Sequence, residues 1–247
     1  KILMCGVHFM AETAKIMSPE KKIILPDFSA GCSLAESITA DDVRKLKKDN
    51  PGIPVVTYVN TSADVKAETD ICCTSANAVK IIESLKVDKV IFLPDEYLAK
   101  YVASKTNVKI ISWKGKCEVH ERFTDNEIIE LRKKYPNLKV VSHPECPPEV
   151  IKASDYTGST GSMIDYVKNT NAKDIFLVTE CSMSDNIQIE NPNINFVKPC
   201  NLCPHMKKIT LQGILKSLKN ENNYVEIDKK IIQRARGAIE RMIAVGR

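Results

Sequence analysis

Short runs of apolar residues alternate along the chain with segments in which apolar residues recur at helical spacing. The apolar runs are rich in Val and Ile: KIILP, IPVVTYVN, KVIFLPD, VKIISW, LKVVSHP, DIFLVTE and INFVKP. The segments with i, i+3, i+4 spacing are DDVRKLKKDNPG, ANAVKIIESL, EYLAKYVASKT, DNEIIELRKKYPN and GSMIDYVKNT. Near-continuous apolar strands separated by helices are typical of parallel sheets covered on both faces. The pattern therefore predicts an α/β fold of three-layer αβα units.

The predicted strands and turns recur at one constant shift in residue number. VVTYVN begins at Val55 and VVSHPE at Val140, while the turns TSAN and STGS begin at Thr74 and Ser159. A third pair, IFLPD and FLVTE, has the same shift. Self-similarity at a fixed period, here about 85 residues, is the signature of repeated structural units. We therefore expect three pseudo-symmetric units around a central site.

The period also suggests where the units begin and end. Residues 51–136 are assigned to a second unit and residues 137–203 to a third. Residues 1–50 form the first unit, and residues 204–247 form a helical segment expected to pack on it. Only 31 residues precede Cys32, the first repeat-related cysteine. The first unit is therefore expected to be truncated at its N-terminus by about 54 residues.

Each unit is predicted to end with a strand followed by a cysteine. Cys32 and Cys117 are separated by one full period, and Cys203 lies one position beyond the next period. Three thiolates from separate turns suit an iron–sulfur cluster or zinc, but the chain lacks the paired CxxC motifs typical of structural zinc sites. A 4Fe-4S cluster held by three cysteines would keep one iron open to a substrate.

The other cysteines are expected to have different roles. The motif CNLC gives Cys200 the spacing of a redox pair with Cys203, so one hypothesis is a regulatory disulfide and the other a bystander thiol. The remaining cysteines are expected to be small buried hydrophobic residues: Cys5, Cys72, Cys73, Cys146 and Cys181.

Polar residues occupy equivalent positions at the ends of the predicted strands. Tyr58 corresponds to His143, and Asn60 to Glu145. Parallel α/β units bind ligands at the carboxyl ends of their strands. His143 and Glu145 are therefore candidates for an acid–base pair. His8 occupies the related turn of the first unit.

Two hydroxyl residues are also equivalent and stand at predicted helix starts. Ser75 and Thr160 could bind a carboxylate or phosphate there, together with backbone N–H groups. They could equally serve as N-caps. His120 and His205 lie just beyond two of the proposed ligand cysteines, and we expect a supporting or surface role for them rather than catalysis.

Composition narrows the function classes further. Nine cysteines spread through a Lys- and Glu-rich chain of 247 residues favour a reducing, cytoplasmic location over a secreted disulfide scaffold. The net charge of +5 is mild and the basic residues are scattered, so nucleic-acid binding is not indicated. No apolar run reaches the roughly 18 residues that a membrane span needs.

Several motifs, taken in order and spacing, resemble those of a known enzyme family. They are CGVHFMAETAKIMSPEK, AGCSLA, YVNTSADVKAETD, CTSANAV, KGKCEVHERF, HPEC, GSTGSM and CPHMKKITL. The chain thereby resembles quinolinate synthase, the iron–sulfur enzyme family of NAD biosynthesis. The resemblance implies a transferase that condenses iminoaspartate with dihydroxyacetone phosphate to quinolinate, with loss of phosphate and water. The loop CSMSDNIQ departs from the family pattern, and the family's N-terminal substrate-binding segment is not represented.

The resemblance also implies particular site residues. Cys32, Cys117 and Cys203 would hold a 4Fe-4S cluster with one open iron acting as a Lewis acid. Glu145, His143 and Tyr58 would be catalytic. The substrates would be contacted by His8, Tyr58, Asn60, Ser75, His143, Glu145, Ser159 and Thr160. An L-aspartate oxidase or aspartate dehydrogenase supplying iminoaspartate is the expected functional partner, and neither nucleic acid nor a membrane is expected to be bound.

Two other functions fit part of the pattern. A radical enzyme of the diphthamide-synthesis type also brings three repeats to a three-cysteine cluster, but it needs a site for S-adenosylmethionine. A binding module stapled by zinc or a disulfide would use the cysteines without catalysis. The motifs YVN and HPE fit the quinolinate synthase family better.

Overall fold

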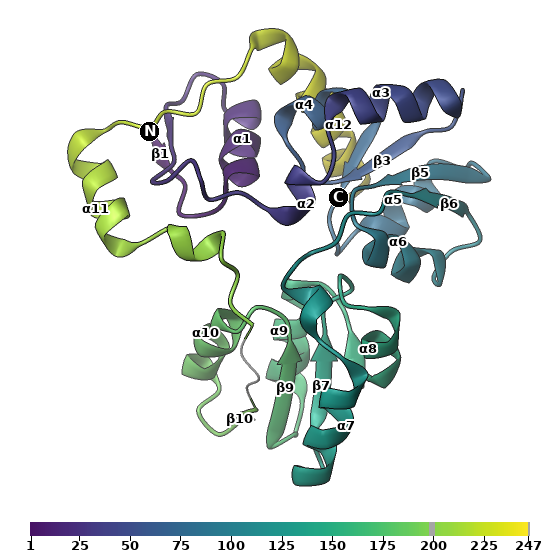
Figure 1. Ribbon diagram of the computed structural model, residues 1–247, viewed down its shortest axis with the longest axis vertical. Coiled ribbons are helices and arrows are strands. Elements are labelled where there is room, and N and C mark those ends of the chain that lie inside the picture. The colour runs from purple at the N-terminus through teal and green to yellow at the C-terminus, as the bar shows by residue number, and fades with distance from the viewer. Residues whose placement is uncertain (198–200, 247) are drawn as a thin grey trace.

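The computed structural model describes residues 1–197 and 201–246, and it contains three parallel sheets placed around the centre of the molecule (Figure 1). The smallest sheet pairs β1 (Ile2–Leu3) with β2 (Ile23–Ile24), and α1 (His8–Met17) connects them. Two helices, α2 (Ser33–Glu36) and α3 (Ala40–Asp49), then lead to the second sheet. The predicted α/β class with parallel sheets is confirmed.

The two larger sheets share one strand order. The second sheet has the order β4-β3-β5-β6 and contains β3 (Val55–Tyr58), β4 (Ile71–Cys73), β5 (Lys89–Leu93) and β6 (Lys109–Ser112). The third has the order β8-β7-β9-β10 and contains β7 (Lys139–Ser142), β8 (Tyr156–Thr157), β9 (Asp174–Val178) and β10 (Asn195–Phe196). In each unit the strand that comes first in the sequence, β3 or β7, occupies the second position of the sheet. A shared strand order is expected of repeated units.

The helices of these two units connect successive strands. In the second unit they are α4 (Ala63–Ala67), α5 (Ala78–Ser84) and α6 (Glu96–Ala103). In the third they are α8 (Pro148–Ala153), α9 (Thr160–Asn169) and α10 (Ser182–Glu190), and the 3₁₀ turn η1 (His120–Arg122) and α7 (Asp125–Lys134) lie between β6 and β7. Among the helices of the described residues, none is long and apolar enough to cross a membrane.

The period of the sequence is reproduced in the register of strand pairing. Val55 pairs with Ile91 in the second sheet, and Val140 pairs with Phe176 in the third. The period also relates two capping boxes, because the box that starts α3 at Thr39 recurs at the start of α7. The sequence repeat is therefore a repeat of backbone geometry.

The last strand explains the displaced third cysteine. Lys89 of β5 pairs with Lys109, whereas Asp174 of β9, the repeat equivalent of Lys89, pairs with Asn195. Asn195 lies one position beyond the repeat equivalent of Lys109, so one extra residue lies between β9 and β10. The same extra residue displaces Cys203 by one position.

The sequence pattern missed three of the short strands. Strands β1, β4 and β8 contain two or three residues each, which is too short to show a period of two. β4 and β8 lie at the edges of their sheets. Each edge strand pairs with only one neighbour, so it can be short and need not contain a long run of β-favouring residues.

The C-terminal helices join two units. α11 (Leu211–Asn220) follows the 3₁₀ turn η2 (Met206–Lys208), and α12 (Lys229–Gly246) contacts α4, α5 and β4 as well as α1. Ala235 and Ala238 of α12 share one buried cluster with Cys72 of β4 and Ile16 of α1. Division of the chain at residues 50, 136 and 203 stays a prediction.

Candidate functional site

A cavity of about 750 Å³ lies between the three units. Eight residues predicted from the sequence line it: Cys32, Tyr58, Asn60, Cys117, His143, Glu145, Thr160 and Cys203. Several of them follow β3 and β7 directly at their carboxyl ends, where parallel sheets bind ligands.

Three predicted residues are not among the described lining residues. The ring of His8 packs edge-on against Phe28, with 5.6 Å between the centroids. Ser75 lies behind His143, with its Oγ 3.3 Å from Nε2 of that ring. Ser159 is the N-cap of α9. Their contact with a substrate stays a prediction.

The interpretation of Ser75 and Thr160 as N-caps is wrong. The N-cap of α5 is Asn77, whose Oδ1 accepts the N–H of Thr74 at 2.7 Å. The N-cap of α9 is Ser159, and Thr160 is the first residue inside that helix. Capping therefore does not account for the hydroxyls of Ser75 and Thr160.

Hydrogen bonds and an ion pair hold the three cysteine turns side by side. Ser33, which follows the first cysteine, accepts the N–H of Glu118 and donates to the carbonyl of Lys116, both at 3.1 Å. These two residues flank the second cysteine. Oε1 of Glu118 lies 2.8 Å from Nε2 of His205, which follows the third cysteine by two positions. The three turns thus form one connected group.

Burial keeps two of the thiols protonated. It raises the pKa of Cys32 to about 11, although the backbone N–H groups of Ala35 and Leu34 lower it. Burial, together with Glu145, raises the pKa of Cys117 further above its ordinary value. A metal displaces such a proton because thiolate, not thiol, is the ligand. N–H groups directed at sulfur also stabilise the charge of a metal–thiolate group.

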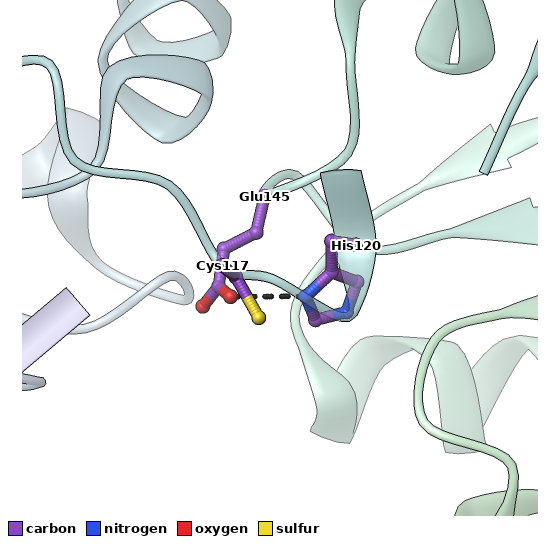
Figure 2. A group of neighbouring side chains, drawn as sticks. All are labelled: Cys117, His120 and Glu145. Carbon is purple, nitrogen blue, oxygen red and sulfur yellow. Dashed lines mark ion pairs between the residues drawn. The ribbon is translucent and has the colours of Figure 1, made fainter. Parts of the chain in front are cut away.

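Glu145 is the centre of a buried acid–base network. Its Oε1 accepts the hydroxyl of Tyr58 at 2.6 Å, and its Oε2 lies 3.0 Å from Nδ1 of His120 (Figure 2). The His120 ring stacks on His143 with 4.9 Å between centroids, and its Nε2 lies 3.0 Å from Oγ1 of Thr179. Both carboxylate oxygens are therefore engaged by side chains from separate elements, one at the end of β3 and one in η1.

The network separates the protonation states of its members. Burial raises the pKa of Glu145, but His143, His120 and Tyr58 outweigh it and lower that pKa to about 2. Burial lowers the pKa of His143 to about 4 and raises that of Tyr58 well above its ordinary value. At neutral pH the site therefore holds an ionised carboxylate, a neutral imidazole and a protonated phenol. Groups with such separated states can divide acid and base roles.

Cys117, His120 and Glu145 could also hold a metal ion. One ligand atom from each lies within 4.8 Å of the others (Figure 2). Thiolate, imidazole and carboxylate are all ligands of transition metals. Only one of the three predicted cysteine ligands belongs to this group, while Cys32 and Cys203 line the same cavity separately. The site thus offers metal donors in two overlapping sets.

His120 has a larger role at this site than the sequence indicated. It is 7% exposed, so a surface position is wrong, and a supporting role beside Glu145 is what the contacts show. The sequence did contain one indication of this role, because His120 follows Cys117 by only three residues. In the structure it is the first residue of η1, one helical turn after Cys117. Thr179 and Glu180 at the end of β9 also line the cavity and were missed.

The remaining cysteines differ from one another. Cys72, Cys73 and Cys146 are buried free thiols, as expected. Cys5 is exposed and lines the cavity, so the expectation of a buried residue is wrong for Cys5. Cys181 is buried, as expected, but it is disulfide-bonded. Cys203 is a free thiol, whereas Cys200 lies outside the described residues. Because Cys203 is free, the hypothesis of a disulfide between Cys200 and Cys203 is wrong for this structure.

A fully buried lysine lies behind the cavity wall. Lys66 of α4 donates a hydrogen bond to the carbonyl of Thr61. Its Nζ lies 5.5 Å from the ring centroid of Phe9, which lines the cavity. Burial lowers the pKa of Lys66 to about 8, although Cys72 and Glu12 oppose this.

This depressed pKa predicts a specific pH dependence of stability. Between pH 8 and 10.5 the folded chain has released the Lys66 proton while the unfolded chain still binds it, so the free energy of unfolding rises with pH. The full effect corresponds to about 3 kcal/mol. In Lys66→Met the rise should be absent. Urea denaturation of both proteins at stepped pH measures the difference, and parallel curves would contradict the prediction.

Comparison with known proteins shows that the chain is similar in sequence to one protein family over nearly its whole length. A family model described as "Quinolinate synthetase A protein" matches residues 1–244. Quinolinate synthase 1 of Mesorhizobium japonicum is 57% identical over 244 residues, which cover 99% of this chain and 75% of that protein. The quinolinate synthase of Sinorhizobium fredii is 59% identical over 242 residues, 98% of this chain and 67% of that protein. That of Xylella fastidiosa is 56% identical over 244 residues, 99% and 72%.

Proposed function

The chain belongs to the quinolinate synthase family, and on that premise we propose that it condenses iminoaspartate with dihydroxyacetone phosphate to quinolinate, with loss of phosphate and water. The observation that carries the proposal is the buried contact of Glu145 with Tyr58 and His120, in a cavity that three free thiols also line. A partly enclosed, mixed polar and apolar cavity of this size suits two small metabolites.

We propose further that Cys32, Cys117 and Cys203 hold a 4Fe-4S cluster. The donor set fits, because three free thiols from three turns line one cavity and backbone N–H groups directed at Cys32 and Cys117 stabilise a thiolate at each of these two positions. When bound, such a cluster supplies an open iron that acts as a Lewis acid toward a substrate. Glu145 and His120 are engaged with each other and with Tyr58 and Thr179, which favours the thiols over the Cys117, His120 and Glu145 set.

The buried network would move the protons of the reaction. Condensation and ring closure require protons to leave carbon atoms beside carbonyl or imine groups and to be returned to departing oxygens. The ionised Glu145 can accept such a proton, and the protonated Tyr58, hydrogen-bonded to it, can orient the carboxylate and donate. The neutral His143 ring is held by Ser75 and can relay a proton in either direction.

Neutral donors would position the substrates. Thr160 lies in the first turn of α9, so its hydroxyl and the N–H groups of that turn can bind a carboxylate or phosphate. Asn60 follows β3 on the opposite unit and also lines the cavity. Holding both substrates between two units would replace a bimolecular encounter by a reaction of positioned groups.

Product formation tests the proposed function directly. The protein is loaded with iron and sulfide under anaerobic conditions and incubated with freshly generated iminoaspartate and dihydroxyacetone phosphate. We expect quinolinate and phosphate in equal amounts, measured by mass spectrometry and a phosphate assay, with no product when either substrate is omitted. Loaded protein that yields no quinolinate, or that instead cleaves S-adenosylmethionine, would contradict the proposal.

A further inference from the structure

The cavity has an unbalanced set of charged side chains. Among the described residues that line it, Glu118, Glu145 and Glu180 are acidic, and no lysine or arginine is present. If the proposed function holds, both substrates are anionic, since iminoaspartate carries two carboxylates and dihydroxyacetone phosphate a phosphate. An anion that enters a partly closed site with three carboxylates needs a cation or several directed donors nearby.

Most lysines close to the cavity already have fixed partners. Lys116 forms an ion pair of 2.6 Å with Glu121, and Lys208 donates to the carbonyl of Ser29 at 2.7 Å. Lys66 is buried behind the wall and bonded to a backbone carbonyl. None of these three ammonium groups reaches the cavity surface without losing a strong partner.

Lys207 differs from them, because its partner is a neutral side chain of the cavity wall. Its Nζ donates to Oγ of Ser182 at 2.8 Å, and Ser182 lines the cavity. The N–H and hydroxyl of Ser182 donate in turn to Glu180 at 2.9 and 3.3 Å. If the Lys207 ammonium group exchanges the neutral Ser182 hydroxyl for an anion, it loses a weak hydrogen bond and gains a stronger, charge-assisted one.

The backbone fixes where this ammonium group begins. The N–H of Lys207 donates to the carbonyl of Cys203 at 3.1 Å, in the turn that leads into η2. Met206, the preceding residue, lines the cavity. The lysine stem therefore starts on the turn of one proposed ligand cysteine and ends at the first turn of α10.

We propose that Lys207 binds an anionic group of a substrate, phosphate or carboxylate, at the α10 side of the cavity. Ser182 and Asn186, both lining residues on α10, would be its neutral partners in this subsite. A lysine suits the task because its flexible stem carries a compact charge that can follow the ligand. Glu180 at the same wall is the charge that Lys207 faces through Ser182 when the subsite holds no anion.

Steady-state kinetics of Lys207→Gln test the proposal, with Lys208→Gln as the matched control from the same turn. In Lys207→Gln we expect the KM for one of the two substrates to rise roughly 10- to 100-fold, the usual loss for a hydrogen bond to a charged group. The substrate whose KM rises identifies the bound group as phosphate or carboxylate. Lys207→Arg should keep most of the affinity, and Lys208→Gln should leave both KM values unchanged. If both KM values are unchanged in Lys207→Gln, the proposal is overturned.

A binding measurement separates this inference from the proposed function. Calorimetric titration of the loaded protein with inorganic phosphate and with succinate, a simple dicarboxylate, requires no turnover. We expect at least one of these anions to bind and its affinity to fall about tenfold or more in Lys207→Gln. An unaltered affinity in the variant, or no binding of either anion to the unmutated protein, would overturn the subsite. Absence of quinolinate formation with this binding intact would instead contradict the proposed reaction alone.

Discussion

Replacement of Cys117 by serine is expected to remove bound iron and sulfide together with quinolinate formation. Serine has nearly the same size, and the turn around residue 117 is held by the bonds of Ser33 to Lys116 and Glu118, so the fold should persist. A serine oxygen is a much poorer ligand for a soft iron–sulfur group than a thiolate. Anaerobic reconstitution followed by iron, sulfide and product assays measures the effect.

The matched control for this change is Cys72→Ala. Cys72 is also a buried free thiol, and burial raises its pKa to about 11. It lies in β4 and packs against α12, and it is not among the cavity-lining residues. It should keep full iron and sulfide and lose only about 1–2 kcal/mol of stability from the cavity that alanine leaves. If Cys117→Ser keeps cluster and product, Cys117 is a packing residue and the metal centre lies elsewhere.

The repeat made the architecture predictable from sequence. The period of about 85 residues in the sequence is also the period of the strand pairing. Val55 pairs with Ile91, and the equivalent residues Val140 and Phe176 pair in the next sheet. Tyr58 and His143 could be placed at one cavity because the carboxyl ends of parallel strands are where such sheets bind ligands. Cys32 and Cys117 followed from the same spacing.

Contacts between units could not be predicted in this way. His120 lies close to Cys117 in the sequence, but its contact with Glu145 depends on how the turn after β7 is placed against η1. Lys207 contacts Ser182 although the two residues lie 25 positions apart in the sequence. Hydrophobic periodicity reports which face of an element is buried, and it contains no information on which polar side chains then meet.

Helix starts show a second limit. Ser75 and Thr160 stand where the pattern changes from strand to helix, and capping or binding fitted both equally. The structure puts the caps at Asn77 and Ser159, two residues after and one residue before the predicted positions. Helix boundaries inferred from pattern alone are uncertain by such amounts, so a functional hydroxyl and a capping hydroxyl cannot be separated at sequence level.

Replacement of Glu145 by glutamine is expected to lower kcat by about 100- to 10,000-fold, the range for loss of a general base. Glutamine keeps the shape of the side chain and can still accept the hydrogen bond from Tyr58, but it cannot take up a proton. The ion pair with His120 is also lost. Glu149→Gln, on the exposed start of α8, is the control and should leave kcat unchanged.

The metal content of Glu145→Gln distinguishes the two donor sets of the cavity. If three cysteines hold the metal centre, the variant keeps iron and sulfide and loses only turnover, because Glu145 is then a base and not a ligand. If the metal is instead held by Cys117, His120 and Glu145, the variant loses metal and activity together. Retained iron with retained kcat would contradict the assignment of Glu145 as the base. In that case His143, which is neutral and bonded to Ser75 in the same cavity, becomes the residue to replace next.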